Sequence, residues 1–399
     1  MKRAKPEYSA NFPYLLKLLS CVLNDTMPPK PNADTDWASV FYMAQCHSVA
    51  GMVYYALLKM ESEDKPSEDI LNKFREAYTL DLLKETNVSF EAEALLKLFR
   101  EKGIETVPVK GFCIKKDYPE SAMRTMTDID LLCKREDIPS VLSIFERRGY
   151  SVRNYNLEEL DATLEPFHHY EVHSVLIKNY HTYGGYFDDF FYRSKAENGC
   201  DYLSLSPDDS YIYLLAHLAK HLESGGAGIR MIMDVYVFNK KHKAELNDDY
   251  LRVELEKIRL HKFRNVVESL ANNWFSGEEP KTDTLVADYI LCCCTFGTGK
   301  NAVLANALSY EKETGKKQTG TKRVLRSIFP SVKDMSKKYH KLAKFRILYP
   351  FYWCRYWFER IFKYRNLNKD NLKNYYRSTD SEDGRKVAAM LKDMGLEER

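Results

Sequence analysis

The spacing of apolar residues changes along this 399-residue chain and divides it into regions. Apolar residues recur at helical spacing over residues 14–22, 37–59 and 70–102, with polar, turn-rich stretches between them. From about residue 104 to residue 201, short β-branched and alternating runs replace this spacing, and after residue 206 it returns. The pattern predicts an α+β fold, in which a small mixed sheet is flanked by N-terminal and C-terminal helical regions.

A chain of this length is expected to form two or three domains. We place the boundaries of the predicted regions as follows: an N-terminal helical region at 1–102, an α/β core at 103–203, a helical domain at 204–308 and a basic, aromatic-rich helical region at 309–399. Asp36 and Ser206 are of residue types that cap helix N-termini, and Pro207 suits a first helical turn. Helices are therefore expected to begin at residues 37 and 207.

Two aspartates lie close together in an apolar run of the α/β region. Residues 104–109 (IETVPV) read as a buried strand that leads into Lys110 and Gly111, and a second strand carries Asp128 and Asp130. Residues two apart on a strand point to the same face, so the two carboxylates would lie side by side. Two adjacent carboxylates repel each other, which makes a bound divalent cation the simplest explanation, and Mg²⁺ favours carboxylates combined with phosphates.

Other residues around the aspartates carry a family resemblance. The segments 109–111 (VKG) and 128–132 (DIDLL), together with Tyr118-Pro119 and Arg124, resemble the nucleotidyltransferase superfamily that includes DNA polymerase beta, and within it an uncharacterised bacterial nucleotidyltransferase family. The resemblance implies a nucleotidyltransferase core in which the Gly111 turn contacts a nucleoside triphosphate (NTP). A serine usually follows that glycine, but this chain has Phe112, so the serine's phosphate contact is left unassigned.

The resemblance also implies a third carboxylate, within an acid-x-histidine pair that is matched by Glu171 and His173. Residues 169–177 alternate well enough for a strand, with Glu171, His173 and possible neighbour His169 on one face. Glu171 is the expected third metal ligand or base. His173 is either a site residue or a strand histidine bonded to a neighbour.

These parts predict metal-dependent transfer of a nucleotidyl group from an NTP such as ATP to a hydroxyl acceptor, with release of pyrophosphate. Two Mg²⁺ ions roughly 3.5 to 4 Å apart would bridge the aspartates and the triphosphate. The predicted catalytic residues and metal ligands are Asp128, Asp130 and Glu171, and the predicted nucleotide-binding residues are Lys110, Gly111, Arg124 and His173. The acceptor, which we leave open, is RNA, a small molecule or a protein. The alternative is a catalytically inactive nucleotide- or RNA-binding protein of the same fold.

Two further residue pairs fall in the helical domain. His217 and His221 lie one helical turn apart, where they would hold zinc, line a substrate site or serve only structure. The HExxH glutamate of metalloproteases is missing between them. Arg230 and Asp234 also share a helix face, and the resemblance places both pairs near the nucleotide or acceptor pocket, with a salt bridge within the helix as the alternative.

Charge and cysteine content complete the picture. Residues 310–399 hold 23 Lys and Arg against 11 Asp and Glu, and the segment 346–365 mixes aromatic residues with arginines, so it would bind RNA, lie on an anionic membrane, or pack its aromatic residues on the helical domain. The segment 296–303 (FGTGKNAV) lacks full P-loop spacing.

Nine cysteines without metal or redox spacing are expected to be reduced core thiols. No segment is apolar enough to span a bilayer, and we expect a cytoplasmic protein.

Overall fold

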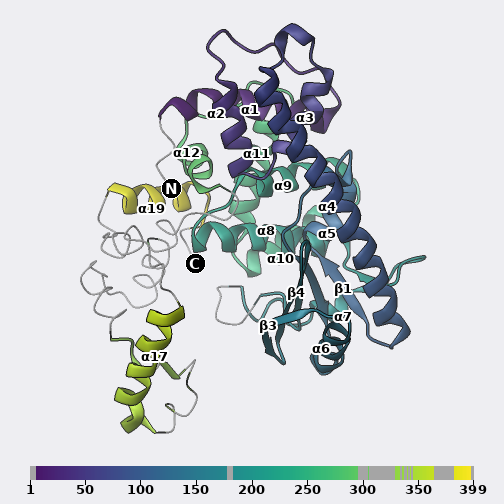
Figure 1. Cartoon of the computed structure of the whole chain (residues 1–399), viewed down its shortest axis with the longest axis vertical. Coiled ribbons are helices and arrows are strands. Elements are labelled where there is room, and N and C mark those ends of the chain that lie inside the picture. Colours follow the sequence, from purple (N-terminus) through teal and green to yellow (C-terminus); the bar gives the residue numbers. More distant parts are fainter. Residues whose placement is uncertain are drawn as a thin grey trace.

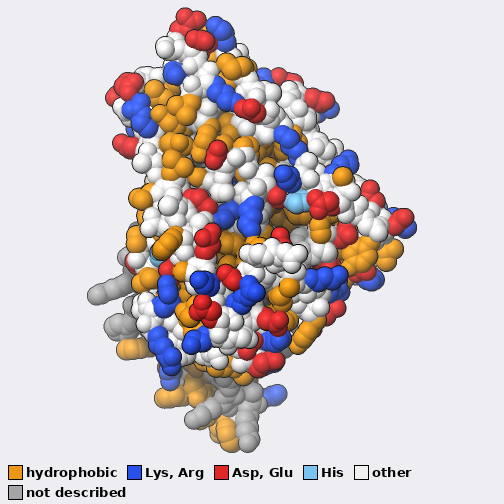
Figure 2. Space-filling view, turned by 90° about the vertical axis from the view of Figure 1, so that its right-hand side faces the viewer, with side chains coloured by type: hydrophobic (Ala, Val, Ile, Leu, Met, Phe, Trp, Pro, Cys, Tyr) orange, Lys and Arg blue, Asp and Glu red, His pale blue; other side chains and the backbone are white. Residues whose placement is uncertain are grey.

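The computed structural model describes residues 6–177, 183–294, 304, 329–332, 335–336, 339, 342, 345–363 and 382–396, with the side chains of 6–9 and 359–363 excepted. In Figure 1 the sheet lies at the lower right, beneath a large helical body, and the long helix α4 (Glu68–Glu101) runs down the right side of both. This arrangement confirms the predicted α+β fold. The surface on that side mixes acidic, basic and apolar side chains (Figure 2). The segment 296–303 lies outside the described residues. So does the basic, glycine-containing segment 312–326, which sequence reasoning predicts to be a loop.

The main sheet is mixed and has five strands in the order β1-β2-β5-β4-β3. Strands β2 and β5 are parallel, whereas β1-β2, β5-β4 and β4-β3 are antiparallel. Sequence reasoning places a short strand at residues 150–155, which the structure confirms as one arm of a hairpin. It missed the other arm, although residues 159–164 (ELDATL) alternate strictly between polar and apolar types. The bounds are β1 Thr106–Val109, β2 Ile129–Cys133, β3 Ser151–Asn156, β4 Glu159–Leu164 and β5 His168–His173.

The two faces of this sheet pack against different layers. On one face, Ile129, Leu131 and Val172 join a core that includes Phe145 of α6 (Ile138–Arg147). On the other face, Val109 and Leu132 join the core of the helical body. Side chains alternate along a strand, so every second residue of β2 and β5 faces the helical body.

The helical body is built from two segments that are far apart in the sequence. Helix α1 packs on α11, where Ser20 Oγ and Asn24 Nδ2 both donate to the carbonyl of Phe275, at 2.9 and 2.6 Å. The predicted caps are confirmed: Asp36 accepts from the Ala38 amide and Ser206 from the Asp209 amide, as the N-cap of α8. The helices are α1 Pro6–Asn24, α2 Trp37–Cys46, α3 Ala50–Lys59, α4 Glu68–Glu101, α8 Pro207–Ser224, α9 Ile229–His242, α10 Asp248–Lys257, α11 His261–Phe275 and α12 Leu285–Cys293.

Short helical turns and a second, two-stranded sheet complete the described structure. A single helical turn follows β1 directly, and a two-stranded sheet lies beside the same strand. The elements are α5 Gly111–Ile114, α7 Phe190–Arg193, β6 Lys195–Ala196 and β7 Leu203–Ser204, together with single 3-10 turns at Ser62–Asp64, Lys115–Asp117, Ser121–Met123, Arg135–Asp137 and Arg346–Leu348.

The two described C-terminal helices behave differently. Helix α19 (Glu382–Asp393) packs on α12 and adds Val387 and Met390 to the main core. Helix α17 (Tyr349–Lys363) lies apart from the body in Figure 1 and packs its aromatic residues on a small cluster around Tyr339. Packing of these aromatic residues on the helical domain was one of three alternatives for the segment. The described residues do not show it, because this nearer cluster takes up their partly buried faces.

Two remaining sequence predictions concern membranes and thiols. Among the helices that the structure describes, none combines the length and apolarity needed to cross a bilayer. All nine cysteines are free, but only Cys133 and Cys293 are buried. The prediction of core thiols is thus correct for these two residues and wrong for Cys113, Cys292 and Cys354, which are exposed.

Candidate active site

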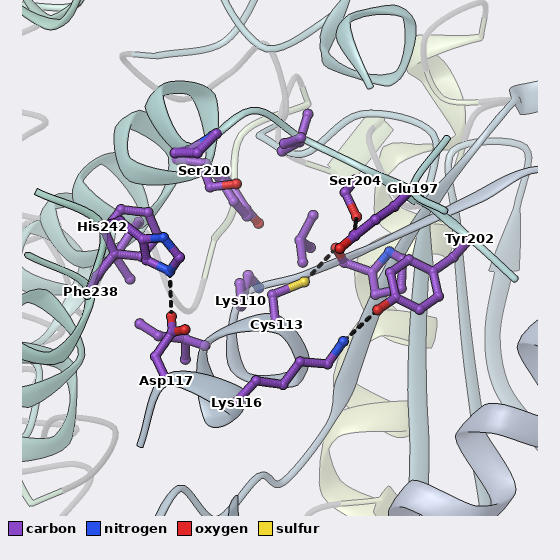
Figure 3. Close-up of a pocket in the computed structure, with 17 residues that line it drawn as sticks. Lys110, Cys113, Lys116, Asp117, Glu197, Tyr202, Ser204, Ser210, Phe238 and His242 are labelled. Atoms are coloured by element: carbon purple, nitrogen blue, oxygen red, sulfur yellow. Dashed lines mark hydrogen bonds and ion pairs between the residues drawn. The ribbon is translucent and has the colours of Figure 1, made fainter. Parts of the chain in front are cut away.

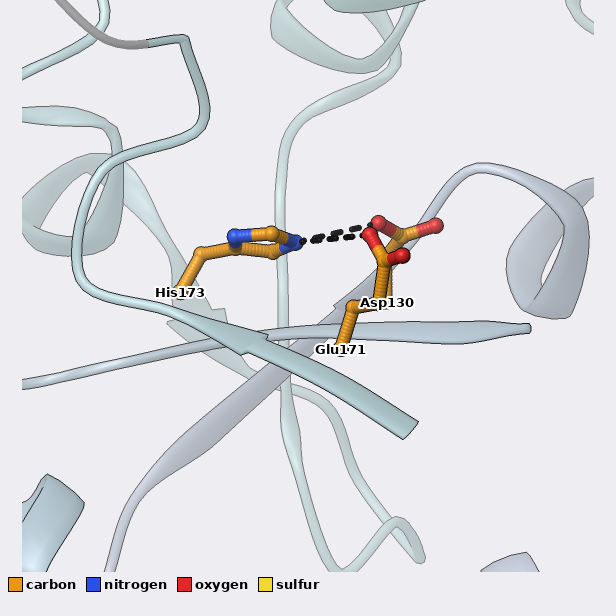
Figure 4. Close-up of side chains that lie close together, drawn as sticks. All are labelled: Asp130, Glu171 and His173. Atoms are coloured by element: carbon orange, nitrogen blue, oxygen red, sulfur yellow. Dashed lines mark hydrogen bonds and ion pairs between the residues drawn. The ribbon is translucent and has the colours of Figure 1, made fainter. Parts of the chain in front are cut away.

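The acidic site forms where β2 and β5 run side by side. Their parallel register places Asp130 next to Glu171, and His173 follows on the same face of β5. His173 Nε2 lies 3.3 Å from Asp130 Oδ1 and 3.5 Å from Glu171 Oε2. Figure 4 shows the three side chains converging above the sheet, and their ligand atoms all lie within 4.8 Å of one another. Within the described residues, this trio is the group of histidine, cysteine and acidic side chains close enough to share a metal ion.

Asp128 lies just outside this trio. It precedes the first residue of β2, and its Oδ1 accepts a hydrogen bond from Thr127 Oγ1 at 2.9 Å. Burial raises the pKa of Asp128, and the nearby carboxylate of Asp130 raises it further. Asp128 therefore borders the site two residues before Asp130, and its role as a metal ligand stays a prediction.

Lys110 supplies the positive charge closest to the trio. Its Nζ lies 2.7 Å from Asp130 Oδ1. Burial alone would raise the pKa of Asp130, but Lys110 and then His173 outweigh burial and lower it. Burial likewise opposes the charge of Lys110, whose pKa is nevertheless raised by the Asp130 carboxylate. Asp130 is therefore ionised, the form that ligates a cation, while Lys110 is protonated.

Glu171 and His173 influence each other in the same way. The hydrogen bond from His173 is the largest cause that lowers the pKa of Glu171. Burial works against a charged His173, but its bonds to Asp130 and Glu171 outweigh burial and raise its pKa. The site therefore combines two ionised carboxylates with an imidazole that readily carries a proton.

Gly111 and Phe112, which follow strand β1, are both tightly packed. A Cβ atom on Gly111 would lie 3.0 Å from Met126 Cγ and 3.5 Å from Arg124 Nη1, so little room exists for a larger residue. Phe112 is 5% exposed and belongs to the core on the other face of the sheet. The position where related enzymes carry serine therefore serves packing in this chain.

Arg124 is held in a buried ion pair. Its Nε and Nη2 donate to the two carboxylate oxygens of Asp234 on α9, at 2.6 and 2.7 Å. Tyr118 Oη also donates to Asp234, at 2.7 Å. The pair ties the loop before β2 to the helical body. The guanidinium of Arg124 still reaches the Gly111 turn through Nη1. The same Nη1 donates to the carbonyl of Thr125 at 2.7 Å.

Arg230 therefore has a different partner from the one expected. Its Nη1 donates to both the carbonyl and the hydroxyl of Thr125, at 2.9 Å each. The salt bridge between Arg230 and Asp234, one of the two alternatives for this pair, is not formed among the described residues, because Arg124 occupies both oxygens of Asp234. The Nε atom of Arg230 is buried without a hydrogen-bond partner. Burial lowers the pKa of Arg230 to about 10.

Sequence analysis missed Lys84, a further cation of this region, which lies on α4. Lys84 is half-buried and makes no ion pair with the described residues, and Asp128 is one of the carboxylates that act on it. Burial, followed by the charge of Arg230, lowers its pKa. No local pattern in the 34-residue α4 marks this lysine, because its role depends on the tertiary approach of a distant loop.

Helix α8 contributes one further wall of the site. Tyr213, His217, Lys220 and His221 recur on one face of this helix, and the two histidines touch through their Nε2 atoms at 3.1 Å. Burial is the largest cause that lowers the pKa of both histidines, and Lys110 lowers them further. Sequence analysis singled out the histidine pair but missed Tyr213 and Lys220, although the three- and four-residue spacing would have found them.

A pocket of about 230 Å³ adjoins Lys110 on the outer side of β1 (Figure 3). Its wall is largely apolar and aromatic. At its rim, Lys116 Nζ donates to Tyr202 Oη at 2.5 Å, and His242 Nε2 lies 3.0 Å from Asp117 Oδ2. The lining residues are Pro108, Val109, Lys110, Cys113, Ile114, Lys116, Asp117, Glu197, Tyr202, Ser204, Leu205, Pro207, Ser210, Tyr213, Leu214, Phe238 and His242.

The fold and the site define an α+β protein with two carboxylates and a histidine gathered on one face of a small mixed sheet, below a cation-bearing helical body. The chain belongs to the family described as "Uncharacterised nucleotidyltransferase", whose model matches residues 33–276. This match confirms the family expected from the sequence motifs. No curated protein and no solved structure matches the chain.

Proposed function

We propose that this protein transfers a nucleotidyl group from an NTP to a hydroxyl acceptor, with Mg²⁺ as cofactor and pyrophosphate as the leaving group. The observation that carries the proposal is the convergence of Asp130, Glu171 and His173 on neighbouring strands of a nucleotidyltransferase-family chain. Buried carboxylates this close repel one another unless a cation neutralises them. Lys110 and His173 supply that charge in the structure, and a divalent ion would replace part of it.

The donor set fits a divalent cation. Asp130 and Glu171 offer ionised oxygens, the donors that Mg²⁺ prefers, and Asp128 at the border of the site would complete the set. When bound, the two-ion site would polarise the α-phosphate and stabilise the attacking and leaving oxygens. Glu171, which lies 3.5 Å from His173 Nε2, would orient the acceptor hydroxyl and accept its proton.

The triphosphate would lie on the Gly111 side of the site. Lys110, Lys84 and Arg230 all bring positive charge to this side, and the buried Nε of Arg230 has an unused donor. Cations placed around developing negative charge on a leaving pyrophosphate lower the barrier to transfer. We assign Arg124 a supporting part at Gly111, because Asp234 already occupies two of its donor nitrogens.

The pocket beside β1 is suited to the nucleoside. It adjoins Lys110, and its apolar and aromatic wall provides the kind of surface on which a planar base packs. Figure 3 shows three polar side-chain pairs around it, Lys116–Tyr202, His242–Asp117 and Ser204–Glu197, so these groups already have partners. The proposal selects no base, so ATP and the other three NTPs are compared in the assay below.

One observation favours a binding protein without turnover. Phe112 is buried at the position where a serine usually contacts phosphate, so this chain lacks that hydroxyl. An inactive nucleotide- or RNA-binding protein of the same fold is therefore the second candidate. For RNA, the exposed Phe351 and Phe358 of α17, next to the arginines of that helix, are the proposed contact region. We also propose that the protein works in a reducing cytoplasm, because its cysteines are free.

The proposal is tested by pyrophosphate release from each of the four NTPs, with Mg²⁺ and with total RNA or a metabolite extract as acceptor. The double variant Asp128→Asn/Asp130→Asn should abolish release, whereas Asp201→Asn, a partly exposed control that pairs with Arg100, should leave it unchanged. Nucleotide binding without release for any NTP and either acceptor pool would favour the binding protein. Release that survives in the double variant would exclude the assigned site.

A further inference from the structure

Helix α17 carries apolar side chains on two opposite faces. One face is half-buried, where Tyr352 and Trp353 pack on the small cluster around Tyr339. On the other face, and in the turn that leads into the helix, Phe351 is 64% exposed and Ile347 is 88% exposed. A helix that is apolar all round is ordinarily buried on all sides, so the exposed face indicates a contact surface.

The exposed apolar residues form a stripe at helical spacing. Positions 347, 351, 354 and 358 are four, three and four residues apart, which places them on one side of a helix. The apolar stripe consists of Ile347, Phe351, Cys354 and Phe358, with Phe345 and Leu348 beside its first residue, and all of these are exposed. Among the large apolar residues that the structure describes, Ile347 is the most exposed.

Basic residues surround the apolar stripe. Residues 337–365 of the sequence contain nine Lys and Arg against one acidic residue, Glu359. Arg346 and Arg355 are exposed next to the stripe. This combination is complementary to a bilayer with anionic headgroups, because apolar side chains enter the acyl boundary while the cationic groups meet the phosphates. The same charge repels a second copy of the segment, which disfavours self-association through the stripe.

Single-stranded RNA, which the second candidate function places on α17, is disfavoured by the ring contacts. RNA bases stack on open aromatic faces. Trp353 is already stacked on Phe329, with ring centroids 5.4 Å apart, and Tyr352 is stacked on Tyr339, with centroids 4.8 Å apart. Ile347 has no ring on which a base could stack. A lipid surface accommodates the aliphatic and the aromatic members of the stripe alike.

We propose that the apolar stripe docks the protein on an anionic phospholipid bilayer, with Ile347 and Phe351 inserted at the acyl boundary and the surrounding basic residues on the headgroups. A helix of this kind lies in the plane of the interface. Figure 1 shows α17 at the lower left, apart from the helical body and from the sheet, which leaves it accessible to a flat surface. No residue of the acidic site takes part, so this docking is independent of the proposed function.

The test is flotation of the full-length protein with vesicles of phosphatidylcholine mixed with phosphatidylglycerol, and with vesicles of phosphatidylcholine alone. Wild type should bind the anionic vesicles at least tenfold more tightly than the neutral ones. The double variant Ile347→Ser/Phe351→Ser should weaken binding to the anionic vesicles at least tenfold, because two apolar side chains no longer leave water. Phe90→Ser, which removes a 75% exposed phenylalanine from α4, is the matched control and should bind like wild type.

Two further measurements keep the result interpretable. Circular dichroism melting curves should be the same for wild type and for both variants, because the substituted side chains are exposed. Phe351→Trp keeps an apolar side chain in the stripe and reports its depth. Lipids that are brominated on the acyl chains should quench the fluorescence that this substitution adds to the wild-type signal, whereas an unquenched signal would show that the stripe stays outside the acyl region.

The remaining outcomes would each contradict the docking. Wild type might fail to float with the anionic vesicles, or the double variant might float equally well. Equal flotation that disappears as NaCl rises from about 0.1 to about 1 M would show adsorption by charge alone. Binding of poly(U) that the double variant loses, without vesicle binding, would assign the stripe to RNA. A wild-type dimer that the double variant loses in sedimentation, again without vesicle binding, would assign it to a second copy. Pyrophosphate release is measured separately and decides the proposed function by itself.

Discussion

The Arg124–Asp234 pair should act mainly on stability. The two side chains are 10% and 3% exposed and are joined by two charge-assisted hydrogen bonds of 2.6 and 2.7 Å. Removal of one partner of a buried ion pair costs roughly 3 to 5 kcal/mol, because the other charge stays buried and unpaired. In Arg124→Met, Asp234 keeps only the hydroxyl of Tyr118 among its side-chain partners. We expect this variant to lose about 3 to 5 kcal/mol of unfolding free energy.

The assay is urea denaturation followed by circular dichroism. On the folded variants, Mg²⁺-dependent binding is measured with α,β-methylene-ATP, an ATP analogue that cannot release pyrophosphate. The double variant Arg124→Met/Asp234→Leu should recover a large part of the loss, since neither charge remains buried. Arg252→Met removes an exposed arginine from a surface pair and should change stability by less than about 0.5 kcal/mol. If Arg124→Met unfolds like wild type but binds the nucleotide tenfold more weakly, Arg124 contacts phosphate and our assignment is wrong.

Three further variants probe the surroundings of the site. Phe112→Ser should lower the unfolding free energy by about 3 kcal/mol or more without tightening nucleotide binding, because the side chain lies in the core; tighter binding would show that the new hydroxyl reaches phosphate. Lys84→Met should weaken α,β-methylene-ATP about tenfold, which is about 1.4 kcal/mol, in a binding titration, and an unchanged affinity would remove Lys84 from the triphosphate side. Burial raises the pKa of Asp81 to about 7, well above its value of about 4 in an unfolded chain. The stability of wild type should therefore fall relative to Asp81→Asn as pH rises from about 4 to about 7 in urea titrations, whereas parallel curves would contradict the shift.

The fold was largely predictable because its signals are local. Helical spacing located the helices, Asp36 and Ser206 marked two of their starts, and the run ending in Asp130 marked the central strand. The second strand of the β3–β4 hairpin was missed although its six residues (ELDATL) alternate strictly between polar and apolar types, so its pattern could have predicted it. The union of α1 with α11 in one core could not be predicted, because contacts between such distant segments leave no periodic signal.

The site was predictable only where strand geometry fixes it. Two residues on one strand face share a direction, so the pairing of Glu171 with His173 followed from their spacing, and their approach to Asp130 required only that β2 and β5 be neighbours. The partners of Arg124 and the positions of Lys84 and Lys220 depend on how the helical body sits on the sheet. Such tertiary placement is invisible in a single sequence.

The central claim, nucleotidyl transfer at the Asp130 site, is tested most directly by following the label of radioactive NTPs. The protein would be incubated with Mg²⁺ and a metabolite or RNA extract, in parallel with α-³²P- and γ-³²P-labelled nucleotide, using wild type and Asp130→Asn. We predict that the α label becomes attached to an acceptor, that the γ label leaves as pyrophosphate, and that Asp130→Asn abolishes both. Transfer of the γ label to the acceptor, or equal α-label transfer by Asp130→Asn, would contradict the account.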